Sequence, residues 1–228
     1  METLSANEII ASLINDFRSG HITTIYGNAA TGKTTTCLMA VIEAAKKGWK
    51  TVYIDSEGSF DSDRLKQLYG ENTDKILETL FLIHPKSFEE QDDIIKRLPK
   101  LCKSNKVKLL VIDTIGIHYR LAVKEDPKPV NTYLILQMNL LERLAKDMDK
   151  IVIVTNQAGS RFDRKDEIKM VGGEIVEKSS KCVIEFHKKD NERFATLVKY
   201  KTEDEINMVE RIGKVVEFTI KEKGLFLV

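Results

Sequence analysis

The sequence predicts an α/β fold in which a mostly parallel, twisted sheet carries helices on both faces. Short runs of β-branched and apolar residues alternate with longer amphipathic stretches along the first two thirds of the chain. The short runs are apolar throughout, as in strands that are buried on both faces. A glycine-rich loop separates the first clear run from the helical stretch that follows it, which is a strand, loop, helix order.

The predicted elements follow from periodicity and from turn residues. Strands are expected at 22–26, 51–55, 80–84, 108–113 and 151–155, and helices at about 33–47, 61–78, 87–103 and 131–148. Before them, Ser5-Ala6-Asn7-Glu8 has the pattern of a capping box and predicts a first helix that ends near Ser19. After Gln157, short strands at 182–187, 194–200, 215–220 and 225–228 are expected to form antiparallel hairpins that extend the same sheet.

Composition limits the kind of protein. The chain has 228 residues, of which 42% are hydrophobic and 31% charged, so we expect one α/β domain over residues 1–228. There are 36 basic and 35 acidic residues, and this balance does not by itself indicate a polyanionic partner. Three scattered cysteines argue against a disulfide framework and fit a reducing cytoplasm. The apolar runs are too short for a membrane span of about 20 residues, so no membrane partner is expected.

The glycine-rich loop is a complete phosphate-binding motif of the form G-x-x-x-x-G-K-[ST]. Its glycines allow consecutive N–H groups to point at phosphate oxygens, and the start of the next helix adds positive charge. Lys33 would bind the phosphates, and Thr34 would place its hydroxyl on Mg²⁺. The expected nucleotide ligands are Gly27, Asn28, Ala29, Ala30, Thr31, Gly32, Lys33, Thr34 and Thr35.

Three later strands end in polar groups that could complete a nucleoside-triphosphate site. Asp113 follows the apolar run Leu109–Ile112 and could hold Mg²⁺ opposite Thr34. Glu57 lies just after the strand that follows the loop helix, where a carboxylate could polarise a water for attack on the γ-phosphate. Gln157 lies just after the strand predicted at 151–155 and could sense the γ-phosphate. Each pattern alone also fits an ordinary turn or strand end.

Together these segments resemble the RecA-fold recombinases, in particular their archaeal RadA/RadB branch. The resemblance rests on Tyr53 to Phe60 followed by Asp63-Arg64, on Leu110 to Thr114, on Val152 to Gln157, and on Gly172-Gly173. It implies a RecA-like ATPase core that uses ATP and Mg²⁺. By this resemblance Glu57 is the catalytic base, Gln157 is the γ-phosphate switch, and Arg64 packs on the adenine. For Arg64, an ordinary solvated helix charge is the alternative.

The resemblance departs from full-length recombinases in two ways. Those proteins carry an N-terminal helix-hairpin-helix domain and an F-x-x-A polymerisation motif, whereas 26 residues precede the loop here and Phe17-Arg18-Ser19-Gly20 does not fit that motif. The short build is similar to RadB, for which the family implies ATP and DNA binding, weak hydrolysis and an accessory role beside a RadA-type recombinase. Filament formation and strand exchange of its own are therefore left open, as is self-association.

Two segments are expected to face single-stranded DNA, at about 117–130 and 158–171. The first has three basic and two acidic residues, and the second has four basic and three acidic ones, so binding should be weak and salt-sensitive. Tyr119 and Phe162 could stack on bases. Two solvated mixed-charge loops are the alternative. The expected DNA contacts are Arg120, Lys124, Arg161, Phe162, Arg164 and Lys165.

Two other functions remain open at this point. A signalling ATPase or autokinase resembling KaiC would use the same core on protein partners, but such proteins often show two adjacent glutamates where this chain has Ser56-Glu57. A nucleotide kinase would need an arginine-rich lid, for which Arg161 and Arg164 are the candidates.

Overall fold

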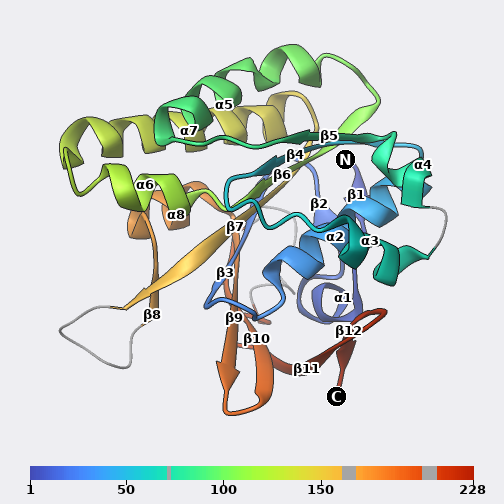
Figure 1. The fold of residues 1–228 in the computed structure, drawn as a ribbon. Coiled ribbons are helices and arrows are strands. Elements are labelled where there is room, and N and C mark those ends of the chain that lie inside the picture. The colour runs from blue at the N-terminus through green and yellow to red at the C-terminus, as the bar shows by residue number, and fades with distance from the viewer. Residues whose placement is uncertain (71–72, 161–167, 202–209) are drawn as a thin grey trace.

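The computed structural model describes residues 1–70, 73–160, 168–201 and 210–228. Its main feature is a ten-stranded sheet in the order β12-β11-β10-β9-β3-β7-β6-β4-β5, with β8 paired to β7. Figure 1 shows this sheet running through the molecule with helices on both sides. The predicted sheet of mostly parallel strands is confirmed.

The parallel half of the sheet is built from strands of near-continuous apolar sequence. These strands are β3 (Ile22–Gly27), β4 (Lys50–Asp55), β5 (Leu80–Ile83), β6 (Val107–Asp113) and the first part of β7 (Ile151–Ser160), and β9 (Cys182–Lys189) is parallel to β3. The predicted C-terminal hairpins are also present, because β10 (Glu192–Tyr200), β11 (Val215–Lys221) and β12 (Gly224–Leu227) follow β9 in antiparallel order.

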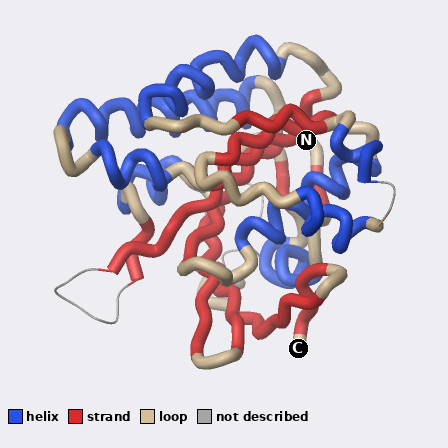
Figure 2. The backbone as a smooth tube through the Cα atoms, in the orientation of Figure 1, coloured by secondary structure: helices blue, strands red, loops and turns tan. Residues whose placement is uncertain are grey.

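Two apolar cores lie on the two faces of the sheet, and each is closed by its own helices. One contains the buried sides of α1 (Glu8–Ile14), α2 (Lys33–Lys46), α3 (Ser62–Tyr69) and α4 (Thr73–Leu77). The other contains those of α5 (Phe88–Cys102), α6 (Gly116–Ala122), α7 (Pro127–Asp147) and α8 (Gly173–Ser179). Figure 2 shows α5 and α7 together along one side of the red strands. Among the described residues, no helix has the length and apolarity that crossing a bilayer requires.

The N-terminal segment differs from the prediction. The first helix is capped by Asn7, whose side chain accepts a hydrogen bond from the N–H of Ile10 at 3.0 Å, so the predicted capping box beginning at Ser5 is wrong. The helix also ends at Ile14, and β2 (Phe17–Arg18) then pairs with β1 (Thr3–Leu4). The side chain of an asparagine accepts a hydrogen bond from the N–H group three residues later as well as that of a serine does.

Three other helix and strand boundaries differ from the predicted ones. The predicted helix at 61–78 is interrupted at Gly70, whose φ of 101° a helix does not allow. The segment at 117–130, expected as a loop, holds α6 and the start of α7, which has proline in its first turn. The strand expected to close at Thr155 continues to Ser160, because β8 (Ile168–Met170) pairs with its far end.

Candidate functional site

The phosphate-binding loop joins the carboxyl end of β3 to α2, and both of its glycines meet specific requirements. A Cβ on Gly27 would lie 1.9 Å from the carbonyl oxygen of Phe186 on the neighbouring strand. Gly32 adopts a φ of 104° as the N-cap of α2, in the left-handed region that side chains disfavour. The loop therefore follows from backbone geometry, as its sequence pattern predicted.

Lys33 is a buried cation inside this loop. Its side chain is 8% exposed, and the Nζ atom donates to the carbonyl oxygens of Gly27 at 2.9 Å and Asn28 at 2.7 Å. Burial lowers the pKa of Lys33, and the carboxylates of Asp113 and Glu57 oppose this shift. A buried ammonium group held by neutral carbonyls is stabilised further when an anion arrives.

Asp113 lies at the end of β6, in register with Asp55 on β4. Its carboxylate accepts hydrogen bonds from the hydroxyl of Tyr53 at 2.7 Å and from that of Thr155. Burial raises the pKa of Asp113, while hydrogen bonds from Thr155, Tyr53 and Thr34 lower it. The predicted pair of Thr34 and Asp113 is thus brought together at the mouth of the loop.

Glu57 and Gln157 meet directly, although they come from different strand ends. The Nε2 atom of Gln157 donates to Oε1 of Glu57 at 2.6 Å, and the hydroxyl of Thr114 donates to the same oxygen at 3.2 Å. Gln157 also accepts, through its carbonyl, the N–H of Val171 at 3.0 Å, which ties it to the strand that returns from residues 161–167. Gln157 thus contacts both Glu57 and Val171.

Lys33, Glu57 and Asp113 line one open cavity of about 520 Å³, and Gln157 lies behind Glu57 without lining it. The loop from Ala29 to Thr35 forms one wall, and Glu57, Asp113 and Thr114 form another. Four lining residues were not predicted as site residues: Ser59 and Thr114 lie beside predicted ones, whereas Arg193 on β10 and Ile220 on β11 come from distant sequence. The Nε of Arg193 donates to the carbonyl oxygen of Ala30 at 3.3 Å. Arg193 and Ile220 belong to the C-terminal hairpins, and no motif marks them. Only the pairing of β9 with β3 brings them to the loop.

Arg64 lies on α3, away from the lining of that cavity. Its guanidinium donates to Gln67 at 2.9 Å and to the carbonyl oxygens of Lys221 at 2.9 Å, at the end of β11, and of Glu222 at 3.0 Å, in the turn that follows. It thus joins α3 to the C-terminal hairpin. Its contact with adenine stays a prediction.

The expected DNA-contacting residues fall into two groups. Arg120 on α6 and Lys124 after it are exposed. Tyr119 is 8% exposed, packs edge-on against Phe88 and donates its hydroxyl to Asn131 at 2.7 Å, so the expectation that it stacks on bases is wrong. The other candidates, Arg161, Phe162, Arg164 and Lys165, lie outside the described residues.

The fold and this site define a phosphate-loop protein of the RecA-like class. The chain belongs to the Rad51 family, whose model matches residues 3–225. The DNA repair and recombination protein RadB of Methanococcoides burtonii is 34% identical over 212 residues, which cover 92% of this chain and 90% of that protein. RadB of Methanocaldococcus jannaschii is 34% identical over 220 residues, covering 95% and 97%.

A solved structure agrees with these relatives. The crystal structure of the RadB recombinase superposes with a TM-score of 0.80 at 29% identity and covers 99% of both chains. The predicted resemblance to the archaeal RadB group is therefore confirmed, together with the RecA-like fold.

Proposed function

We propose that this protein is an ATP-binding accessory factor of DNA repair and homologous recombination. In this proposal it binds DNA and modulates a RadA-type recombinase, with weak ATP hydrolysis of its own. The similarity to several archaeal proteins named for DNA repair and recombination supports this role, since it extends over nine tenths of each chain. The other support is the arrangement of the cavity.

The residues around the cavity fit a nucleoside triphosphate. Lys33, now held by loop carbonyls, would exchange these partners for phosphate oxygens, and the N–H groups between Ala29 and Thr35 would bind the remaining oxygens. Thr34 and Asp113 would hold Mg²⁺, Asp113 either directly or through water. The metal would neutralise charge on the phosphates.

The observation that carries the proposal is the contact of 2.6 Å between Gln157 and Glu57. Glu57 would accept a proton from the attacking water, and Gln157 would leave it to bind the γ-phosphate. Because the backbone of Gln157 holds Val171, nucleotide state would then reach the segment from 158 to 171. A base that is partly occupied by its own sensor is consistent with slow hydrolysis.

The proposed DNA binding is weak, salt-sensitive and directed to single strands. Arg120 and Lys124 would contact phosphates from one side, and Arg161, Phe162, Arg164 and Lys165 would do so from the other. We also propose that the protein works in the cytoplasm and that it can associate with itself, since a neighbouring copy could complete the open cavity.

Fluorescence anisotropy of a labelled single-stranded oligonucleotide tests this function. We expect binding at low salt that strengthens with a non-hydrolysable ATP analogue, and no such strengthening in the Lys33→Ala variant. Absence of DNA binding at low salt, together with incorporation of labelled phosphate into the protein, would instead indicate a signalling ATPase.

A further inference from the structure

The strongest concentration of positive charge lies far from the predicted DNA segments, at the amino ends of the parallel strands. Residues 94–112 contain six basic residues and no acidic one, and residues 44–54 contain three basic residues and no acidic one. We call the basic residues of these two stretches the amino-edge patch, leaving out the half-buried Lys108 and Lys96, which pairs with Asp92 in the middle of α5. Its members are Lys46, Lys47, Lys50, Arg97, Lys100, Lys103 and Lys106.

The two stretches form one continuous surface because their strands start side by side. The N–H of Lys50 donates to the carbonyl oxygen of Lys106 at 2.7 Å, and Lys50 pairs with Val107. On the other side of β4, the N–H of Thr51 donates to the carbonyl oxygen of Thr79, just before β5. The patch therefore crosses the starts of β6, β4 and β5.

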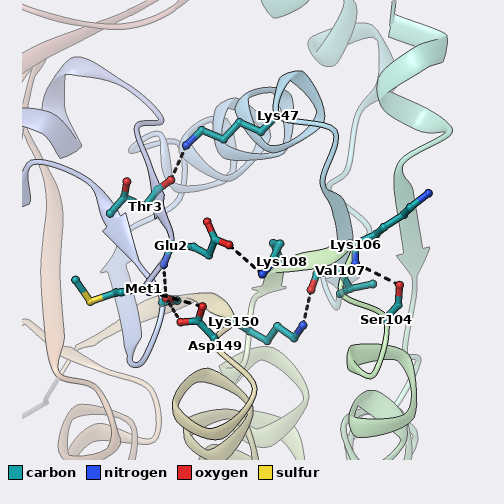
Figure 3. A network of polar contacts seen from close by, with 11 residues as sticks. Met1, Glu2, Thr3, Lys47, Ser104, Lys106, Val107, Lys108, Asp149 and Lys150 are labelled. Atoms are coloured by element: carbon teal, nitrogen blue, oxygen red, sulfur yellow. Dashed lines mark hydrogen bonds and ion pairs between the residues drawn. The ribbon is translucent and has the colours of Figure 1, made fainter.

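Three lysines at this edge already have polar partners. Lys47 donates to the carbonyl oxygen of Thr3 at 2.7 Å, and the neighbouring Lys108 pairs with Glu2 at 2.9 Å (Figure 3). Lys46 pairs with Glu43 at 2.6 Å. In Figure 3 the side chain of Lys106 instead extends away from the network.

The remaining members carry uncompensated charge. Within the described part of the chain, the charged groups of Arg97, Lys100, Lys103 and Lys106 have no ion pair or hydrogen bond. The carboxylates near this edge include Glu2, Glu43, Glu78 and Asp149. Glu2 pairs with Lys108 and Glu43 with Lys46, and Asp149 accepts from Ser19 and lies 3.9 Å from the N-terminal amine. The local balance is therefore clearly positive, unlike that of the whole chain.

Aromatic rings lie among these lysines. The Nζ of Lys47 is 4.8 Å from the ring centroid of Trp49, and that of Lys50 is 5.3 Å from that of Phe81. Phe81 is 40% exposed on the edge strand β5. Basic groups that follow a backbone, with rings on which bases can stack, are the combination that binds single-stranded nucleic acid without regard to sequence.

We propose that the amino-edge patch binds the sugar-phosphate backbone of single-stranded DNA as a second DNA surface, opposite the segments at the carboxyl ends of the strands. This inference rests on the proposed function, since it assumes that the protein meets DNA at all. One molecule would then hold two strand segments, or two turns of one strand, on opposite edges of its sheet.

Trp49 provides a direct test, because it is the only tryptophan in the chain and its ring lies within the patch. We would titrate the 228-residue protein with an oligothymidylate and record both tryptophan emission and the anisotropy of labelled DNA over a range of salt. The test variant is Lys100→Gln, Lys103→Gln, Lys106→Gln. The control variant, Lys66→Gln, Lys75→Gln, Lys178→Gln, removes the same charge from exposed lysines on α3, α4 and α8.

If the patch binds DNA, we expect DNA to change Trp49 emission in the wild type and in the control variant. In the test variant this change should shift to higher DNA concentration, and the slope of log affinity against log salt should fall by about 2, at roughly 0.7 per lost single-strand phosphate contact. Nucleotide binding should be the same in all three proteins, which checks their folding.

Two results would overturn the inference, and they are distinguishable. If wild-type protein binds DNA but the test variant keeps its emission change and its salt slope, the patch does not bind DNA, and the proposed function stands without it. If the wild type binds no DNA at low salt, both proposals fail, and an acidic protein becomes the better partner for these lysines.

Discussion

At the scale of single residues, Lys33 is a buried cation whose partners are the carbonyl oxygens of its own loop. Burial lowers its pKa because the charged ammonium loses hydration. The hydrogen bonds to neutral carbonyl oxygens replace only part of that lost stabilisation. A phosphate anion would supply the missing stabilisation. This is why the cavity favours an anionic ligand although the chain is nearly neutral overall.

The Lys33→Ala variant should lose nucleotide affinity while keeping its fold. A hydrogen bond to a charged group contributes about 1.5–3 kcal/mol, so we expect a loss of roughly 10- to 150-fold. Isothermal titration with ATP and Mg²⁺ measures this. Lys46→Ala, at the exposed end of the same helix, is the matched control and should bind as the wild type does. Equal affinity in both variants would refute the assignment of the site.

The Glu57→Gln variant separates hydrolysis from binding. The amide keeps the size of the side chain and can still meet Gln157 and Thr114, but it cannot accept a proton from water. We expect ATP hydrolysis to fall by about 100-fold or more, with ATP affinity within a factor of about three. Phosphate release under single-turnover conditions is the measurement; an unchanged rate would exclude Glu57 as the base.

At the scale of elements, the phosphate loop depends on how closely β3 and β9 approach each other. Gly27→Ala would place a methyl group 1.9 Å from the carbonyl oxygen of Phe186, and this backbone contact cannot be relieved by a rotamer change. We expect a loss of about 3 kcal/mol or more, at the upper end for overpacking. Gly48→Ala, at a φ of 72° with open space around it, should cost only about 1 kcal/mol. Urea unfolding compares the two variants.

The sequence predicted those elements whose signals are local. Gly27 to Thr34 and the apolar run that ends at Asp113 lie where they were expected, because a glycine loop and a doubly buried strand have few alternative structures. Other helix boundaries differ from the prediction at Gly70 and at the prolines that begin α7. The backbone requirements of these residues are not visible in the hydrophobic periodicity. Arg193 could not be predicted, since its place beside Ala30 depends on strand pairing across the sheet.

The strand β7 should carry the signal from the nucleotide to the segment beyond it. Its Gln157 contacts Glu57 through the side chain and Val171 through the backbone. We expect a non-hydrolysable ATP analogue to change the hydrogen exchange of the Val171 amide in the wild type, and to leave it unchanged in Gln157→Ala. Exchange measured by mass spectrometry on peptides that contain Val171 tests this. An equal response in both proteins would mean that the coupling runs elsewhere.

At the scale of the whole molecule, the sheet separates two surfaces of different character. The carboxyl ends of its strands hold the nucleotide cavity, while the amino ends hold the lysines of the amino-edge patch. The proposed function places nucleotide control at the first edge. If the amino-edge patch holds DNA at the second edge, one small chain could bring strands together for a recombinase of the same family.

Nucleotide binding should control association with DNA, and sedimentation velocity can measure this. The protein would be run alone, with a non-hydrolysable ATP analogue and Mg²⁺, with single-stranded DNA, and with both. We expect the protein to move with the DNA most strongly when the analogue is present, and added salt to reverse this. A monomer whose sedimentation is the same in all four samples would contradict it.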